Sequence, residues 1–166
     1  MERKPATVFA PAEMRERRQA FTQRLNPGSA FQIFRLGLRS GLVRTGVSIV
    51  WLAPGKESFA YHAHRAEEEW IFILEGKAVC RIDGKEVTLS PGDFVGFPVP
   101  SVPHLLRNPF DVDCRYLVGG SRPEMDIIDY PDLGKSFVIH GDEGGTDFQE
   151  LAPPIRPFGP AETEGR

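Results

Sequence analysis

Between residues 31 and 118 the sequence consists of short apolar-rich runs separated by residues that form turns. The runs cover 31–38, 43–52, 69–74, 78–82, 86–89, 93–97, 104–108 and 112–118. Asp83-Gly84 is the clearest turn, because both residues tolerate the positive φ angles that a tight β-hairpin needs. Many short strands at intervals of roughly 8–12 residues predict an all-β sandwich or barrel.

The two ends of the chain lack this pattern. Residues 1–30 are predicted to form an N-terminal arm, with a short helix over 12–21 where good helix formers gather. Residues 31–120 are predicted to form the barrel, and residues 121–166 an irregular C-terminal extension and tail. We expect 124–132 to pack back as an irregular segment, and 152–166, with four prolines and several charges, to be a mobile tail.

Composition excludes several classes of partner. The 166-residue chain carries a net charge of −3, which provides no basic field for nucleic acid or an anionic membrane surface. It contains neither an apolar stretch of about 18 residues nor an N-terminal signal pattern, so we expect a cytoplasmic protein without membrane contact. Cys80 and Cys114 are predicted to be reduced, buried thiols.

Three of the four histidines form a candidate metal site. His62 and His64 are two residues apart, so on an extended segment both imidazoles point to the same face. A carboxylate from the next strand suits the third ligand position, with Glu69 as the first choice and Glu68 as the alternative, and His104 could complete the set. Singly, such residues are usually structural or solvated. His140 is expected to face solvent.

Two longer patterns contain these residues and resemble the motifs of the cupins, which are small double-stranded β-helix (jelly-roll) barrels. The first consists of Gly55, His62, His64, Glu69 and Gly76, and the second of Gly92, Pro98, His104 and Asn108. The second pattern departs from the family at Pro100, where Gly is usual, and by one residue inserted before His104. The resemblance covers residues 31–120 and is closest to small bacterial single-domain (conserved barrel) cupins. It implies that the metal ligands are His62, His64, Glu69 and His104.

Three histidines and one carboxylate leave one or two open positions on a five- or six-coordinate divalent metal. Iron, manganese or nickel fits best, and zinc is also possible. The open positions predict a metal-dependent enzyme, dioxygenase-like or isomerase-like, that acts on a small organic molecule. The alternatives are a non-catalytic small-molecule binding or sensing module with a bound metal, and a purely structural metal.

Strand phase gives two further predictions. The inward-facing residues are expected to form a dry ligand pocket and comprise Ala60, Ile71, Ile73 and Leu106. The outward-facing residues would give a homodimer contact an apolar centre and comprise Trp70, Phe72 and Leu74. Candidates for an acid–base group are Arg44, Tyr61, Arg81 and Tyr116, although ordinary surface placement is the more common role for each.

Overall fold

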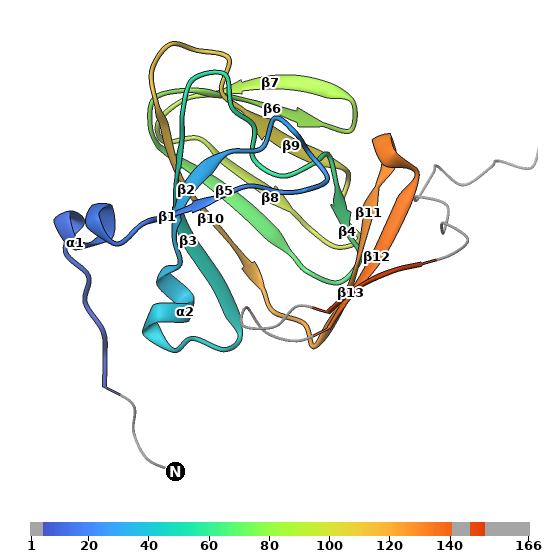
Figure 1. Cartoon of the computed structure of the whole chain (residues 1–166), viewed down its shortest axis with the longest axis horizontal. Helices are drawn as coiled ribbons and strands as arrows, with labels where there is room; N and C mark the ends of the chain where they lie inside the picture. The colour runs from blue at the N-terminus through green and yellow to red at the C-terminus, as the bar shows by residue number, and fades with distance from the viewer. Residues whose placement is uncertain (1–4, 141–146, 152–166) are drawn as a thin grey trace, which may run out of the picture.

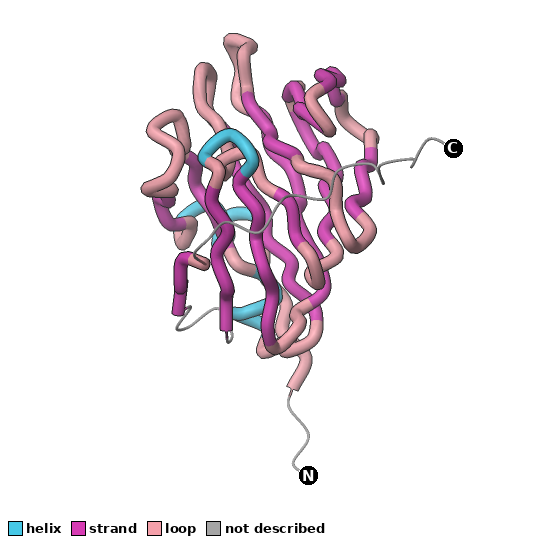
Figure 2. Tube along the Cα trace, turned by 90° about the vertical axis from the view of Figure 1, so that its right-hand side faces the viewer, coloured by secondary structure: helices cyan, strands magenta, loops and turns pink. Residues whose placement is uncertain are grey.

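The structure is a computed structural model that describes residues 5–140 and 147–151. Figure 1 traces the chain, and Figure 2 shows that strands dominate it, with helix confined to short segments. The all-β prediction is confirmed. The helical elements are α1 (Pro11–Glu16), α2 (Leu36–Ser40) and the 3-10 helix η1 (Pro131–Leu133). The strands are β1 (Gln19–Phe21), β2 (Phe31–Phe34), β3 (Thr45–Leu52), β4 (Ala63–His64), β5 (Glu69–Glu75), β6 (Ala78–Ile82), β7 (Lys85–Leu89), β8 (Phe94–Phe97), β9 (His104–Arg107), β10 (Cys114–Ser121), β11 (Met125–Tyr130), β12 (Lys135–His140) and β13 (Asp147–Glu150).

The strands form two layers. One layer is a six-stranded antiparallel sheet in the order β1-β2-β3-β10-β5-β8. The other consists of a three-stranded sheet, β7-β6-β9, and a four-stranded sheet, β13-β12-β11-β4. These two sheets meet at an antiparallel bridge between His62 and His104, whose backbone N–H groups donate to each other's carbonyl oxygens at 3.1 and 2.8 Å. We call this bridge the histidine seam.

The main core lies between the six-stranded sheet and the three-stranded sheet. Both cysteines lie in it with buried, unpaired thiols, as predicted. Its largest fully buried members include Leu52, Ile73 and Leu106. A second, smaller cluster lies beneath β11 and contains Ala60, Ile128 and Tyr130.

The inward-facing residues of the six-stranded sheet change in size from one end of the barrel to the other. Where β5, β10 and β3 pair, one row consists of Ile73, Tyr116 and Val50, which fill the interior. Two rows further along, the residues are Glu69, Gly120 and Gly46. Two side chains of this row are therefore missing, and the barrel is packed at one end and open at the other.

The N-terminal arm differs in detail from the prediction. The helix ends at Glu16, with Pro11 at its first turn, where a proline costs no hydrogen bond. Residues 19–21 of the predicted helix instead form β1, which pairs with β2 and extends the six-stranded sheet. Phe21 explains the strand, because its ring stacks on Phe31 at 5.0 Å. In Figure 1, α1 projects away from the barrel, and none of its residues is buried.

The C-terminal segment is more regular than expected. Residues 125–130, within the stretch expected to be irregular, form strand β11, which pairs with β4 and with β12. An ion pair holds β11 in place: Arg65 donates to both carboxylate oxygens of Asp129 at 2.8 Å, and Ser136 donates to the same carboxylate. His140 ends β12 and is exposed. The predicted tail, 152–166, lies outside the described residues. Within the described residues, no helix has the length and apolar character that a membrane crossing requires.

Candidate metal centre

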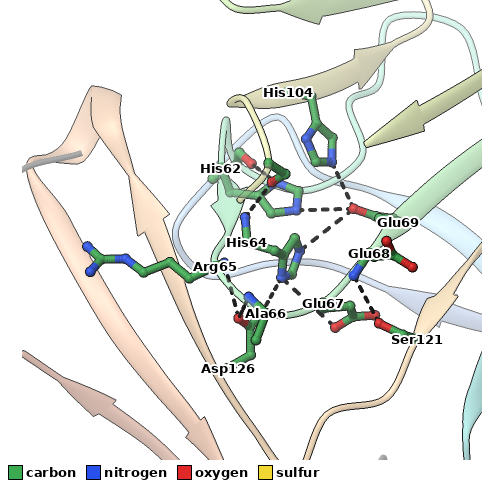
Figure 3. A network of polar contacts seen from close by, with 12 residues as sticks. His62, His64, Arg65, Ala66, Glu67, Glu68, Glu69, His104, Ser121 and Asp126 are labelled. Atoms are coloured by element: carbon green, nitrogen blue, oxygen red, sulfur yellow. Dashed lines mark hydrogen bonds and ion pairs between the residues drawn. The ribbon is translucent and has the colours of Figure 1, made fainter. Parts of the chain in front are cut away.

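The four side chains grouped as ligands meet where the two layers face each other (Figure 3). His62 precedes β4, His64 ends it and His104 begins β9, so the three imidazoles come from the two sides of the histidine seam. Glu69 begins β5 and reaches them from the six-stranded sheet. All four side chains are nearly inaccessible to solvent, with exposed fractions of 8, 8, 3 and 13% for His62, His64, His104 and Glu69.

The outer nitrogen of each imidazole has a fixed acceptor. Nδ1 of His62 lies 2.7 Å from the carbonyl oxygen two residues earlier, and Nδ1 of His104 lies 3.1 Å from the equivalent oxygen. A carbonyl oxygen can only accept, so each Nδ1 carries a proton and donates it. For His64 the acceptor is Oδ2 of Asp126, at 2.6 Å. Each imidazole therefore directs Nε2 toward the centre, in the tautomer that a metal ligand requires.

The three Nε2 atoms converge on one carboxylate oxygen. Oε2 of Glu69 lies 3.8 Å from Nε2 of His62, 3.7 Å from that of His64 and 2.8 Å from that of His104. At 2.8 Å, two atoms that both accept hydrogen bonds need a proton or a cation between them. Three imidazoles and one carboxylate are ligands for iron, manganese, nickel or zinc, so the donor set fits a divalent metal. Glu68, the alternative ligand, is exposed.

The residue inserted before His104 does not displace its side chain. Phe97, at the end of β8, stacks flat against this imidazole with a centroid separation of 3.7 Å and an interplanar angle of 9°. Because Phe97 is 2% exposed, its ring is itself held by the core. The aromatic contact and the backbone acceptor together fix the orientation of His104.

Two of the four groups are in the protonation state that a metal ligand needs. Burial, with the nearby imidazoles of His104 and His64, lowers the pKa of His62 to about 3. Burial alone would raise the pKa of Glu69, but the hydrogen bond with His104 and the neighbouring imidazoles hold it at about 2. At neutral pH the His62 ring is therefore neutral, and Glu69 is a carboxylate.

His64 differs because a carboxylate contacts it from behind. Although burial alone would lower the pKa of His64, the hydrogen bond to Asp126 and the charges of Glu69 and Glu67 raise it to about 9. The same hydrogen bond outweighs burial at Asp126 and lowers the pKa of that carboxyl. Without a metal, the pair is an imidazolium and a carboxylate at neutral pH, and a metal at Nε2 would have to displace a proton.

Sequence reasoning did not identify Glu67 or Asp126. Ligand atoms of His64, Glu67 and Asp126 all lie within 4.8 Å of one another. The Glu67 side chain is 33% exposed, with Oε2 at 3.9 Å from Nδ1 of His64. Burial, together with the charges of Glu69 and Asp126, raises the pKa of Glu67 to about 7. The one sequence signal for Glu67 was its alternation with Glu69.

A cavity of about 610 Å³ opens beside these residues, and His62, His64, Glu67 and Glu69 line one end of it. The apolar wall is not the one predicted. Ile71, Ile73 and Leu106 belong to the main core, and Ala60 packs beneath β11. The apolar wall instead includes Phe21, Ile33, Phe59, Val118, Ile128 and Tyr130.

The four residues named as acid–base candidates do not line this cavity. Arg44 is exposed, and Arg81 forms an ion pair with Asp132. The Tyr61 hydroxyl accepts a backbone N–H from the β6–β7 turn at 2.8 Å. Tyr116 lies in the main core, where burial raises its pKa well above the ordinary value. None of the four is therefore placed to act on a ligand in this cavity.

The family model of the cupin domain matches residues 48–120. No curated protein matches the chain at a significant level. Among solved structures, a protein of Acidithiobacillus ferrooxidans with the proposed name sugar phosphate isomerase is 30% identical, with a TM-score of 0.79, and the match covers 92% of this chain and 97% of that one.

A sugar phosphate isomerase of the cupin superfamily from Silicibacter pomeroyi is 29% identical, with a TM-score of 0.71, and the match covers 84% of this chain and 89% of that one. A protein of Thermotoga maritima, predicted to be an oxalate decarboxylase, has a TM-score of 0.61 over 70% of this chain and 100% of its own. At 19% identity, this last match shows the fold alone. Family model, fold and relatives agree that the chain belongs to the cupin superfamily.

Proposed function

We propose that this cupin is a metal-dependent isomerase of a small sugar phosphate. In this proposal, His62, His64, Glu69 and His104 hold one divalent ion of iron, manganese, nickel or zinc. The observation that carries the proposal is a carboxylate outside the ligand set, Glu67, which opens into the same cavity as the four ligands. The names of the two relatives at 30 and 29% identity support the substrate class.

Isomerisation of an aldose to a ketose moves a proton between two neighbouring carbons, one of which bears the carbonyl group. The bound metal would polarise the carbonyl and hydroxyl oxygens of the substrate as a Lewis acid. A general base is also needed, and a pKa near the working pH serves this role best. Glu67, with a pKa of about 7, is at the cavity wall and is free of the ligand role, so we assign it the proton transfer.

The cavity supports this chemistry in a second way. Its walls are largely apolar, with Phe21, Phe59 and Val118 among the lining residues. Such walls restrict water around a carbanion-like transition state and strengthen the electrostatic effect of each polar group. Proton transfer between two carbons needs an acid–base group beside the metal, and Glu67 would supply it.

The direct test is exchange of the substrate proton with solvent. Protein loaded in turn with Mn²⁺, Fe²⁺, Ni²⁺ and Zn²⁺ is incubated in D₂O with a panel of aldose and ketose phosphates, and NMR follows deuterium incorporation next to the carbonyl. We expect exchange and conversion with at least one pair. Glu67→Gln should lower the exchange rate by about 100-fold or more with unchanged metal content. The matched control, Glu68→Gln, alters an exposed neighbour and should keep the rate.

Two results would contradict the proposal. Exchange at the wild-type rate in Glu67→Gln would remove the carboxylate from the proton transfer. Saturable binding of sugar phosphates without exchange or conversion, with every metal, would instead identify a non-catalytic binding module with a bound metal.

We also propose that the chain forms a homodimer through the outward face of β5 and its edge neighbour β8. Trp70 and Phe94 stack there at 6.2 Å, and Phe94 is 63% exposed. Phe94 is on the edge strand, and its exposed ring leaves apolar surface in contact with water unless another chain covers it. A second copy of the chain can bring the same face to it.

A further inference from the structure

The cavity extends from the four proposed ligands toward a part of the six-stranded sheet that the proposed chemistry does not use. Arg35, Ser48 and Arg122 line it there. We call these three residues the arginine wall. We infer that the arginine wall is the phosphate subsite of the proposed sugar phosphate substrate. The inference rests on the proposed function, which places the reacting carbonyl group at the metal centre. Phosphate binding by the arginine wall can nevertheless be tested by itself.

The sheet register places the arginine wall at a definite distance from Glu69. Glu69 pairs with Gly120 on β10, and Gly120 pairs with Gly46 on β3. Strands in a sheet lie about 4.8 Å apart, so Gly46 is roughly 10 Å from Glu69. Arg122 occupies the inward side of Gly46, because its Nε and Nη2 lie 3.4 and 3.6 Å from the position that a Cβ at Gly46 would take.

Arg35 and Ser48 lie next to this point. Ile33 on β2 pairs with Val50 on β3, and the next residues of the same phase are Arg35 and Ser48. Ser48 lines the cavity and is only 7% exposed. The Arg35 guanidinium lies 5.8 Å from the centre of the Phe21 ring and forms no ion pair within the described part of the chain. Two cations and a buried hydroxyl therefore face the same space.

The two ends of the cavity differ in charge. Glu69 and Asp126 line the histidine end, and Arg35 and Arg122 line the wall. Glu67 lies between the two ends, where the charge of Arg122 acts on it, and Glu124 also lines the cavity. A phosphate monoester carries up to two negative charges and binds guanidinium groups through paired hydrogen bonds. The two guanidinium groups attract it, and Glu69 and Asp126 at the opposite end repel it, so the substrate would bind with its phosphate on the arginine wall.

The spacing fits a sugar phosphate of five or six carbons. From the carbonyl carbon to the phosphorus of a five-carbon sugar there are six bonds, a contour of about 9 Å at about 1.5 Å per bond. This length is close to the roughly 10 Å between Glu69 and the Arg122 side of the wall, so the carbonyl end would reach the four ligands.

The test uses a ligand that cannot be isomerised. Ribitol 5-phosphate has no carbonyl group, so its binding is independent of turnover, and ribitol is the matching probe without phosphate. Isothermal titration of the metal-loaded protein should give much tighter binding for ribitol 5-phosphate. Arg35→Gln and Arg122→Gln should each weaken it by roughly 10- to 100-fold, as expected for loss of a charge-assisted contact, and should leave ribitol binding unchanged.

Arg39→Gln is the matched control, because Arg39 lies on α2 four residues after Arg35, stacks on Phe34 and does not line the cavity. It should bind both probes as the wild type does. Arg122→Lys keeps the charge but not the paired geometry, so an intermediate loss is expected even if Arg122→Gln folds poorly. Metal content and melting temperature show whether each variant is intact.

Equal binding of ribitol and its phosphate by the wild type, or unchanged binding of the phosphate by intact Arg35→Gln and Arg122→Gln, would overturn the inference. The two proposals fail separately. Arginine-dependent phosphate binding without isomerisation of any sugar phosphate would leave the subsite and remove the isomerase. Isomerisation at the wild-type rate in both arginine variants would leave the isomerase and remove the subsite.

Discussion

Replacement of Asp126 by asparagine gives the sharpest test of the metal centre. Oδ1 of Asp126 accepts the backbone N–H groups of residues 65, 66 and 127, at 3.2, 2.8 and 2.8 Å, while Oδ2 accepts Nδ1 of His64 at 2.6 Å. An asparagine must keep its oxygen toward the three backbone donors, so its NH₂ group would face Nδ1 of His64. The imidazole then has to accept at Nδ1 and carry its proton on Nε2, which cannot bind a metal.

The expected loss of metal affinity can be estimated from the other orientation of the asparagine side chain. To keep His64 as a ligand, the new side-chain amide would have to turn and leave three backbone N–H groups without their acceptor. At about 1 kcal/mol for each hydrogen bond, this costs roughly 3 kcal/mol, or about 100-fold in affinity. Loss of a residue that orients a ligand histidine typically costs about 10- to 100-fold. We therefore expect the Kd for Mn²⁺ to rise by about that factor in Asp126→Asn.

The pH of the assay matters. The pKa of His64 is about 9 in the metal-free protein, so at pH 7 the wild type must displace a proton and its affinity is reduced by roughly 100-fold. The asparagine variant lacks the main cause of that raised pKa, so competition by the proton lowers its metal affinity less. The metal affinities of the two proteins would therefore differ less at pH 7. At pH 8.5 competition by the proton lowers the metal affinity of the wild type by less than a factor of about ten, so the effect of the His64 tautomer on the Kd can be measured.

The assay is an anaerobic titration with Mn²⁺ at pH 8.5, in which electron paramagnetic resonance measures the free ion. Asp129→Asn is the matched control, because Asp129 lies on the same strand and pairs with Arg65, away from the histidines. It should lower stability without changing the Kd. Equal Mn²⁺ affinities for Asp126→Asn and the wild type at pH 8.5 would refute the argument that this hydrogen bond fixes the tautomer.

Three further predictions address stability and assembly. The pKa of His64 is raised from 6.5 to about 9 in the fold, so its stabilisation of the metal-free protein is fully present below pH 6.5 and is lost as the pH rises through 9. The loss is on the order of 3 kcal/mol, and urea unfolding at pH 6 and 9.5 should detect it in the wild type and not in His64→Gln. Phe97→Ala should lower stability by about 3–5 kcal/mol in thermal unfolding, because it leaves a cavity against His104, and an unchanged melting temperature would contradict the packing role. Sedimentation equilibrium should give a dimer for the wild type and a monomer for Phe94→Ser, which exposes Trp70, whereas a monomeric wild type would rule out the proposed contact.

The barrel could be predicted from the sequence because its strands carry their own signals. The run 78–82 coincides with β6, and the run 69–74 gave β5 to within one residue. Alternation also assigned Glu69, Ile71 and Ile73 to the inward face, where the register places them. The His-x-His spacing and the two motifs then brought the four candidate ligands together before any contact was known.

The rest depends on contacts between distant parts of the chain. Met125–Tyr130 contains two aspartates and therefore lacks the apolar pattern of a buried strand. Its acids are buried only because His64 and Arg65 pair with them, across more than 60 positions of sequence. The cavity wall was mispredicted for a related reason: alternation tells which residues point inward, but not how deep in the barrel each one lies.

The histidine seam and β11 also impose an order on synthesis. By the time β9 has left the ribosome, the nascent chain holds all four proposed ligands, and His62 can already bridge to His104. The acceptor that orients His64, however, lies 62 residues after it, on a strand that has yet to be made. A chain that stops before Asp126 would therefore carry the four proposed ligands but lack the hydrogen bond that orients His64. Full orientation of the centre marks a chain whose C-terminal hairpin has been translated and has docked.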